Sequence, residues 1–469
     1  MNNKNLIEAE RPGGFLDFLP AEYLAREKML NIITKTFRSF GFDSMETSIV
    51  EFEKTLKGEE SETGKQIFSI MSSDTKGESL NLRFDHTVPF ARILAANPYN
   101  AHDKTGIKLP FKRMVLGPVF RGERPQQGRY RQFYQFDIDI AGSDLMLADA
   151  EVLTLMYQTM KNLGVENFVI RVNNRKVFQA LSDLVRMFVK NDDETATKID
   201  TEIIRVIDKV DKIGIDGIFS ELNKKLLEEF KLSEDVIKNI IKKVKTLLLI
   251  SGNNFEKLDK CEELFKNSEK AQEGITELRE VFELLKKSSV DEKNIVVDFS
   301  IARGLDYYTG TVMETNLLDA PEFGSVFSGG RYNKLLERFT GQELPVVGTS
   351  IGVDRLFVAL DKLNLLDQSE KISTDVMVLR LSDKYDDKYF DVVQKIREAG
   401  MNATICFLGD TTFKRQFNFA LNSGVKFVVI MGEDEISENI LQVKNLETRE
   451  QVEVELGEVE GYFDKVNMD

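Results

Sequence analysis

Residues 133–140 alternate between two kinds of side chain, and this alternation constrains the fold more than any other feature of the sequence. Tyr, Phe and Ile occupy the even positions, whereas three of the four odd positions carry Gln or Asp. Because successive side chains of a strand point to opposite faces, the segment predicts a strand with one apolar and one polar face. An apolar segment, 114–120, precedes it, so the two predict antiparallel neighbours in one sheet. Alternation alone is equally compatible with Asp137 and Asp139 lying on a solvated face.

The connection between these strands, residues 121–132, is rich in Arg, Gln and Gly and is too long for a tight hairpin turn. Residues 108–135 hold seven basic side chains against one acidic side chain, Glu123, although the whole chain has a net charge of −15. A local basic patch on an acidic protein predicts a focused anionic partner, such as a nucleotide or the end of one nucleic-acid strand, rather than a long duplex.

Residues 178–290 differ in composition from the segments around them: they are rich in Lys, Glu, Asp, Ile and Leu and contain no Pro. Apolar residues recur at helical spacing in 236–248 and 275–285, which predicts an all-helical insertion. Strand signals return at 295–299 and 307–315. We expect a Gly-rich turn at 324–330, a helix at 333–339 and the end of this sheet domain near residue 366.

After a polar linker, 367–374, strand and helix patterns alternate again. Expected strands at 376–381, 403–407 and 426–431 enclose expected helices at 386–399 and 413–422. This order is typical of a small parallel α/β domain.

Two Cys and two His residues limit the available chemistry. Such a set cannot form a zinc cage or a disulfide framework, so we expect no protein-caged metal and a reducing compartment. His102 is expected in a surface loop and His86 in the core or at its rim. There is no run of 18 apolar residues and the amino-terminal segment is polar, so we expect no membrane segment and a cytoplasmic location.

Three separated arginines, Arg121, Arg303 and Arg355, are the most informative candidates for binding. Arginine suits bidentate recognition of phosphate, although each one taken singly is more often part of a structural ion pair. Neither His nor Cys accompanies the nearby acidic residues as a nucleophile or base. The residues therefore favour charge stabilisation at a polyphosphate over covalent catalysis.

Several segments that contain these residues resemble the histidyl-tRNA synthetase family of class II aminoacyl-tRNA synthetases, in that family's order. RGLDYYTGTV is the most specific of them, since the other two motifs around Arg121 and Arg355 occur across class II. The segments are RPGGFLDFLP (11–20), LRFDHTVPFAR (82–92), GPVFRGERPQQGRYRQFYQFDIDIAG (117–142), RGLDYYTGTV (303–312), FSGGRYNKLL (327–336), VVGTSIGVDRL (346–356) and FKRQFNFALNSGVKFVVIMGEDE (413–435).

The resemblance implies an α+β class II core, an antiparallel sheet flanked by helices, with an all-helical insertion and a carboxy-terminal α/β anticodon-binding domain. Its parts would be residues 1–177 and 291–366 for the core, 178–290 for the insertion and 374–469 for the anticodon-binding domain. It also implies an ATP-dependent ligase that joins L-histidine and ATP into histidyl-adenylate with release of pyrophosphate, then transfers histidine to the 3' end of its tRNA. Mg²⁺ would accompany ATP, and the protein would be a homodimer.

The resemblance also assigns roles to individual residues. Asp85, Thr87 and Gln135 would receive the α-ammonium group of histidine, and Asp139 and Tyr308 would face the imidazole, with Tyr307 beside them. In the ATP site, Glu123 would bind the adenine amino group, Phe133 would stack on adenine against Arg355, and Arg355 would also reach the γ-phosphate. Arg121 would hold the α-phosphate and the substrate carboxylate, and Arg303 would stabilise the pentavalent α-phosphate and contact histidine.

Two alternative interpretations stay open at this point, a regulatory paralogue without catalytic activity and a related class II synthetase. A regulatory paralogue associated with ATP phosphoribosyltransferase generally lacks the anticodon-binding domain and erodes RGLDYYTG. A class II synthetase for Pro, Thr or Gly would not carry RGLDYYTG or the pair Gln135 and Asp139. The docking of tRNA is assigned as a hypothesis to local bases, namely Lys112, Arg124, Arg129 and Arg131.

Overall fold

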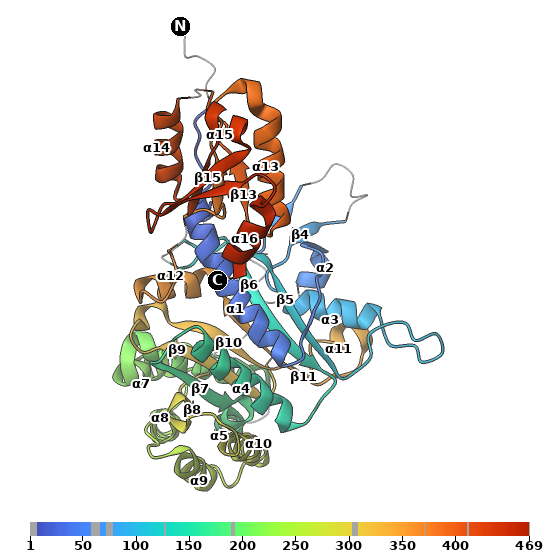
Figure 1. The fold of residues 1–469 in the computed structure, drawn as a ribbon. Helices are drawn as coiled ribbons and strands as arrows, with labels where there is room; N and C mark the ends of the chain where they lie inside the picture. Colours follow the sequence, from blue (N-terminus) through green and yellow to red (C-terminus); the bar gives the residue numbers. More distant parts are fainter. Residues whose placement is uncertain are drawn as a thin grey trace. The chain divides into compact units, whose positions relative to one another are not determined.

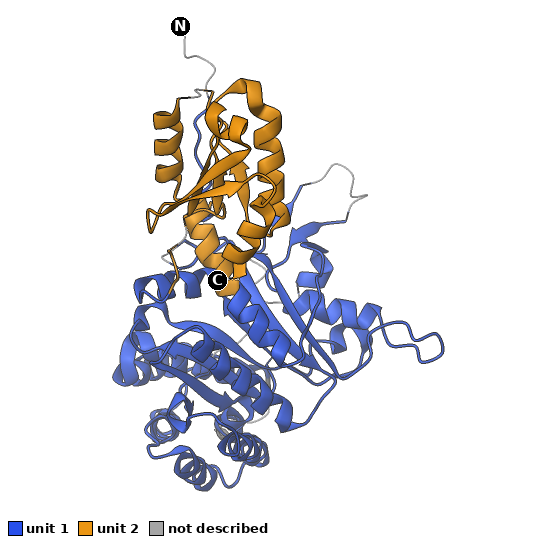
Figure 2. Cartoon of the chain, in the orientation of Figure 1, with its two compact units in different colours: residues 1–16, 31–365 blue, residues 17–30, 366–469 orange. Residues whose placement is uncertain are grey.

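The computed structural model describes residues 7–57, 66–71, 78–125, 128–188, 193–302, 308–369, 371–409 and 412–468. The chain divides into two compact units (Figure 2). The first unit comprises Met1–Leu16 and Asn31–Leu365, and the second comprises Asp17–Leu30 and Leu366–Asp469. Helix α1 (Pro20–Ser39) contributes residues to both.

An eight-stranded mixed sheet, with strand order β1-β5-β6-β11-β10-β9-β7-β8, forms the centre of the first unit (Figure 1). The pairs β1/β5 and β7/β8 at its edges are parallel, and the inner pairs are antiparallel. The strands are β1 (Asp43–Ser44), β5 (Phe111–Phe120), β6 (Gln132–Ala141), β7 (Phe168–Asn174), β8 (Ile295–Val297), β9 (Thr311–Leu317), β10 (Ser325–Arg331) and β11 (Val346–Gly352). The predicted antiparallel neighbours are β5 and β6.

The alternation along β6 separates two faces, as predicted. Phe136 packs edge-on against Phe37 of α1, with ring centroids 4.7 Å apart, and Ile138 is fully buried. The polar face is buried too, since Asp137 and Asp139 are each 3% exposed. The interpretation of a solvated face is therefore wrong, because further layers of the first unit cover this side of the sheet.

Residues 324–330 are not a turn. They form most of β10, an inner strand of the large sheet, and only Gly324 has a left-handed φ, of 64°. A Cβ at Gly329 would lie 2.1 Å from the carbonyl oxygen of Gly348 on β11, so this glycine permits close strand approach. The helix expected at 333–339 is reduced to α11 (Glu337–Thr340).

Helices pack on the sheet, and helices also make up most of the sequence between β7 and β8. Helix α4 (Met146–Asn162) packs across β7, β9, β10 and β11, and α10 packs on α4 (Figure 1). The predicted all-helical insertion is confirmed and belongs to the first unit. Its helices are α5 (Gln179–Phe188), α6 (Asp193–Ile207), α7 (Val210–Glu228), α8 (Glu234–Leu248), α9 (Asn254–Leu264) and α10 (Glu269–Lys286).

A three-stranded sheet and short helices lie beside the large sheet in the first unit. Helix α3 begins directly after Asp85 and His86, and α12 begins directly after β11. The elements are β2 (Val50–Phe52), β3 (Ser69–Ile70), β4 (Leu80–Leu82), α2 (Glu53–Leu56), α3 (Thr87–Ala96) and α12 (Val353–Lys362).

The second unit contains a five-stranded sheet with strand order β13-β12-β14-β15-β16. Its first three strands are parallel, as expected, but β15 and β16 form an antiparallel hairpin that the sequence analysis missed. The Asn445 side chain accepts hydrogen bonds from the backbone amides of Glu447 and Thr448, which stabilises that turn. The elements are β12 (Val376–Val378), α13 (Asp386–Glu398), β13 (Ala403–Ile405), α14 (Phe413–Ser423), β14 (Phe427–Ile430), α15 (Glu433–Glu438), β15 (Ile440–Asn445), β16 (Gln451–Glu455) and α16 (Val459–Met468).

Among the described helices, none is both long and apolar enough to cross a membrane.

Candidate active site

A cavity of about 560 Å³ opens on the polar face of the large sheet in the first unit. It collects side chains from separated parts of the sequence, including most of those that the resemblance assigned to substrates. The expected site residues that line it are Asp85, Thr87, Arg121, Glu123, Phe133, Gln135, Tyr308 and Arg355. Asp139 does not line it, and Arg303 and Tyr307 lie outside the described residues.

Asp85 and Thr87 reach the cavity from the start of α3. One carboxylate oxygen of Asp85 accepts hydrogen bonds from the backbone amides of Thr87 (3.1 Å) and Val88 (3.0 Å). Burial raises the pKa of Asp85, while these amides and the charge of Arg121 oppose the rise. The carboxylate is thus held at the amino-terminal end of a helix, where negative charge is stabilised.

His86, between these two residues, takes no part in lining the cavity. Its Nε2 lies 3.2 Å from the carbonyl oxygen of Gly117, and its side chain is fully buried. Burial, together with the charges of Arg83 and Arg113, lowers the pKa of His86 to about 3, so the ring is neutral at physiological pH. His102 is exposed, as expected.

Arg121 leaves the end of β5 and is held between two aromatic rings. Its guanidinium carbon lies 4.4 Å from the ring centre of Phe84 and 5.1 Å from that of Phe133, and its Nε donates to the carbonyl oxygen of Phe84 at 3.3 Å. These contacts fix the position of the cation at the cavity wall. Phe133, the residue expected to stack on adenine, therefore contacts a guanidinium already.

Asp354 and Arg355 enter the site from the first turn of α12. The Asp354 carboxylate accepts a 2.7 Å hydrogen bond from the backbone amide of Tyr134, next to Phe133 on β6. Nη1 of Arg355 donates to the carbonyl oxygen of Ser325 on β10 at 2.6 Å. The pair thereby anchors α12 to two strands and holds the Arg355 guanidinium at the cavity.

Gln135 and Asp137 form the part of the cavity floor that β6 contributes. Nε2 of Gln135 donates to the Ser350 hydroxyl at 2.6 Å, and neither Oε1 of Gln135 nor Oδ1 of Asp137 has a hydrogen-bond partner among the described residues. Burial raises the pKa of Asp137 to about 7. Both residues line the cavity.

Asp139 lies on the same face of β6 but is engaged within the protein. One carboxylate oxygen accepts a 2.7 Å hydrogen bond from Nε of buried Arg113, and the other accepts from the hydroxyl of Tyr332. A Cβ at Gly348 would lie 2.0 Å from this carboxylate, so glycine is needed opposite it. Asp139 therefore pairs with Arg113 and Tyr332 beside the cavity floor, and its expected contact with the imidazole stays a prediction.

Sequence reasoning missed other cavity residues, including Asp137, Glu314, Ser328 and Ser350. One signal pointed to Asp137, because the alternation of β6 places it on the same face as Gln135. The others lie on β9, β10 and β11, whose order beside β6 no local pattern reveals.

The segments on either side of residues 303–307 are held by the end of β7 and the 3-10 turn Arg175–Phe178 that follows it. Asn173 donates to the carbonyl oxygen of Ile301 at 2.9 Å, and Arg175 donates to that of Ala302 at 3.2 Å. On the far side, the Thr309 amide donates to the carbonyl oxygen of Arg331 at 2.8 Å.

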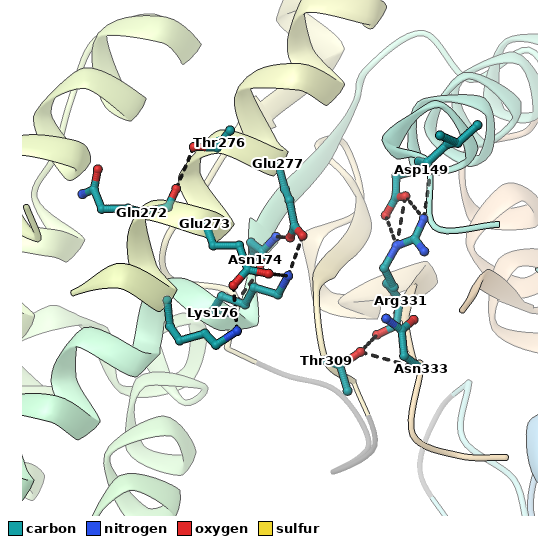
Figure 3. A network of polar contacts seen from close by, with 12 residues as sticks. Asp149, Asn174, Lys176, Gln272, Glu273, Thr276, Glu277, Thr309, Arg331 and Asn333 are labelled. Carbon is teal, nitrogen blue, oxygen red and sulfur yellow. Dashed lines mark hydrogen bonds and ion pairs between the residues drawn. The ribbon is translucent and has the colours of Figure 1, made fainter. Parts of the chain in front are cut away.

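The residues that alternate with Asn173 and Arg175 bind helix α10 instead. Asn174 donates to Glu277 at 2.7 Å, and Lys176 pairs with both Glu273 and Glu277 (Figure 3). The same figure shows Arg331, which pairs with buried Asp149. Residues 173–176 thus contact both helix α10 of the insertion and residues 301–302, which precede residue 303.

The bases proposed to dock tRNA are not equally available. Lys112 pairs with Glu151 at 2.8 Å, and Arg131 donates to the carbonyl oxygens of Glu123 and Gly13. Arg129 lines the cavity. Over the residues that the structure describes, no three His, Cys, Asp or Glu side chains are grouped so that they could hold a metal ion.

A mixed sheet with an antiparallel centre, arginines from β5 and α12 at one cavity and a separate carboxy-terminal sheet unit define a class II aminoacyl-tRNA synthetase architecture. The family model "Histidyl-tRNA synthetase" matches residues 14–356, and "Anticodon binding domain" matches residues 375–465. The chain belongs to the histidyl-tRNA synthetase family.

Individual relatives agree with this assignment. A histidine–tRNA ligase of Clostridium tetani is 37% identical over 459 residues, which cover 97% of this chain and 98% of that protein. The crystal structure of histidyl-tRNA synthetase from a Nostoc species superimposes with a TM-score of 0.79 at 31% identity, and covers 98% of this chain and 100% of that one. A Bacillus halodurans structure, titled as an ATP phosphoribosyltransferase regulatory subunit/histidyl-tRNA synthetase, covers 91% of this chain and 99% of that one (TM-score 0.69, 21% identity) and shows the shared fold alone.

Proposed function

We propose that this chain is a histidine–tRNA ligase that uses ATP to activate L-histidine and then charges the tRNA specific for histidine. The observation that carries this proposal is that one cavity joins two arginines suited to phosphate, Arg121 and Arg355, to the buried acceptors Asp85 and Gln135. Likeness to the family over nearly the whole chain supports it.

In the first step, the substrate carboxylate attacks the α-phosphorus of ATP. A bond forms between the carboxylate oxygen and phosphorus, the bond to the bridging oxygen of pyrophosphate breaks, and pyrophosphate leaves with the electron pair. No general base is needed, because the nucleophile is already an anion. We assign Arg121 to the α-phosphate and the carboxylate, and Arg303 to the negative charge that develops at the α-phosphate.

The remaining lining residues receive the roles implied by the family. Asp85, Thr87 and Gln135 would bind the α-ammonium group, and Tyr308 would face the ring. Glu123, Phe133 and Arg355 would bind ATP. Mg²⁺ would enter with the triphosphate and neutralise part of its charge.

In the second step, a hydroxyl of the terminal adenosine attacks the carbonyl carbon of histidyl-adenylate, and AMP leaves. We assign recognition of the tRNA anticodon region to residues 374–469 and the catalytic core to 1–177 and 291–366, with 178–290 inserted. A homodimer and a cytoplasmic location stay predictions.

ATP–pyrophosphate exchange with each of the twenty amino acids, measured without tRNA, tests the proposal. Exchange with histidine alone, followed by charging of the histidine tRNA, is the expected result. Exchange with no amino acid would favour the regulatory paralogue, whose fold is shared by the Bacillus halodurans structure. Exchange with another amino acid would show that the pocket assignment is wrong.

A further inference from the structure

Arg175 binds both ends of the chain that runs from Ala302 to Gly310. Nη1 of its guanidinium donates to the carbonyl oxygen of Ala302 at 3.2 Å, and its backbone amide donates to the carbonyl oxygen of Gly310 at 2.9 Å. The chain that carries Arg303 and Tyr308 therefore leaves Arg175 and returns to it. The proposed function assigns both of these residues to the substrates, and Tyr308 lines the cavity.

Further contacts hold the same two ends. On the near side, Nδ2 of Asn173, a fully buried residue, donates to the carbonyl oxygen of Ile301 at 2.9 Å. On the far side, the Thr309 amide donates to the carbonyl oxygen of Arg331 at 2.8 Å, and the Thr309 hydroxyl accepts from the Asn333 amide at 3.1 Å (Figure 3). Because fixed ends reduce the number of conformations open to a segment, these contacts limit where the intervening chain can lie.

The backbone that carries Arg175 is itself fixed on two sides. Strand β7, which ends just before it, lies between β9 and β8 in the large sheet. The Asn174 side chain accepts from the Lys176 amide at 3.0 Å and so begins the 3-10 turn. Helix α10 packs so closely on this turn that a Cβ at Gly274 would lie 2.8 Å from Cβ of Lys176. A side chain that positions another group needs such a support.

We propose that Arg175 is a positioning residue for the activation step: by binding the carbonyl oxygen of Ala302, it sets where Arg303, the next residue, meets the α-phosphate. Arg175 is not among the described residues that line the cavity, so its effect passes through the chain that it binds. A guanidinium that donates to a carbonyl oxygen makes a charge-assisted hydrogen bond, which is stronger than a bond between neutral groups. The inference rests on the proposed function and deepens it.

Steady-state ATP–pyrophosphate exchange with histidine and the full chain tests the assignment. Arg175→Ala should lower kcat about tenfold to a hundredfold, the range for a lost charge-assisted hydrogen bond and for a small displacement of a catalytic group. The KM for ATP should change less than about twofold, because Arg303 is assigned to charge that develops in the transition state. Arg175→Lys keeps a cationic donor and should recover part of the lost rate.

The neighbouring residue supplies the matched control. Lys176→Ala removes the pairs with Glu273 and Glu277 but keeps the backbone amide and the Cβ that hold the turn. It should lower the thermal midpoint and leave kcat within about twofold of the wild-type value, because its pairs are partly exposed and lie on α10. Arg175→Met keeps the apolar stem without the donors, and it replaces Arg175→Ala if alanine prevents folding.

A double-mutant cycle with Arg303→Ala separates positioning from a general loss of structure. If Arg175 acts through Arg303, the double variant should exchange within about threefold of Arg303→Ala alone, because the two changes then remove one interaction. Effects that multiply in the double variant would show that Arg175 acts independently of Arg303 and would overturn the proposal. A kcat of Arg175→Ala within about twofold of the wild-type value, or a Lys176→Ala variant that is equally slow, contradicts it as well.

The two levels of the argument fail differently. A wild-type protein that does not exchange with histidine would remove the proposed function and this inference together. A wild-type protein that exchanges with histidine, beside effects of Arg175→Ala and Arg303→Ala that multiply, would remove only the inference. A loss below about tenfold from Arg303→Ala would also remove the inference alone, because there would then be no catalytic group for Arg175 to position.

Discussion

Replacing Asp137 by asparagine should stabilise the ligand-free first unit, and by more at pH 7.5 than at pH 5. Folding raises the pKa of this carboxyl from 3.8 to about 7, so the folded state holds a proton that the unfolded state has lost between these values. The raised pKa therefore costs little stability below pH 3.8, costs more as the pH rises, and reaches its full cost above pH 7.

The size of the effect follows from the shift. A shift of this size corresponds to a full penalty of about 4 kcal/mol, of which less than half is present at pH 5. Asparagine removes the penalty at both pH values. The variant should therefore gain about 2 to 3 kcal/mol more, relative to the wild-type protein, at pH 7.5 than at pH 5.

Calorimetry of ligand-free protein at the two pH values measures this gain. For a unit the size of the first one, about 2 to 3 kcal/mol corresponds to about 3–4 °C in the thermal midpoint. Titrating groups that do not interact with Asp137 are common to both proteins and cancel in the comparison. Asp137→Ala serves as the matched control, because its packing loss is the same at both pH values and the same pH-dependent increment should remain. If Asp137→Asn changes the midpoint equally at pH 5 and 7.5, the argument that burial raises the pKa of this carboxyl is refuted.

Further predictions concern the arginines, the buried histidine and the insertion. Arg303→Ala should slow exchange about a hundredfold to a thousandfold, as for loss of one oxyanion-type donor, and a loss below about tenfold would make Arg303 structural. Arg121→Lys should fail to restore the exchange rate, because lysine keeps the charge but not the two-pronged geometry; near wild-type kinetics would argue against bidentate binding. The ring proton signals of His86 in an NMR titration should not move between pH 7.5 and 5, since burial lowers its pKa to about 3; a midpoint in that range would show that water reaches the ring. Glu277→Gln, which weakens the link to Lys176, should lower the midpoint of the first unit by about 1–2 °C on calorimetry, because partly exposed pairs contribute up to about 1 kcal/mol; a fall well beyond that would mean that the insertion is coupled more strongly to the core.

Much of the fold was predictable because its signals are local. The alternation of β6 follows from the two-residue period of a strand, and the helices of 178–290 follow from the helical period. One prediction failed because the same local sequence pattern is compatible with two different structures. Glycines at 324–330 suggested a turn, but in β10 they allow another strand to approach closely, which depends on a partner distant in the sequence. The hairpin of β15 and β16 was missed although residues 441–444 and 451–455 alternate between apolar and polar side chains.

In the candidate site, too, some features follow from local sequence and others depend on residues distant in the sequence. By itself, the sequence determined the family, the residues of its motifs and the shared face of Gln135, Asp137 and Asp139, because these depend on residue identity and on neighbours along the chain. Only the tertiary structure decided which carboxylate lines the cavity. That choice depends on register: Arg113 on β5 lies opposite Asp139, whereas Val115 lies opposite Asp137. Burial then removes the water that would otherwise make the two carboxylates alike, so cross-strand neighbours pair Asp139 with Arg113 and leave Asp137 lining the cavity.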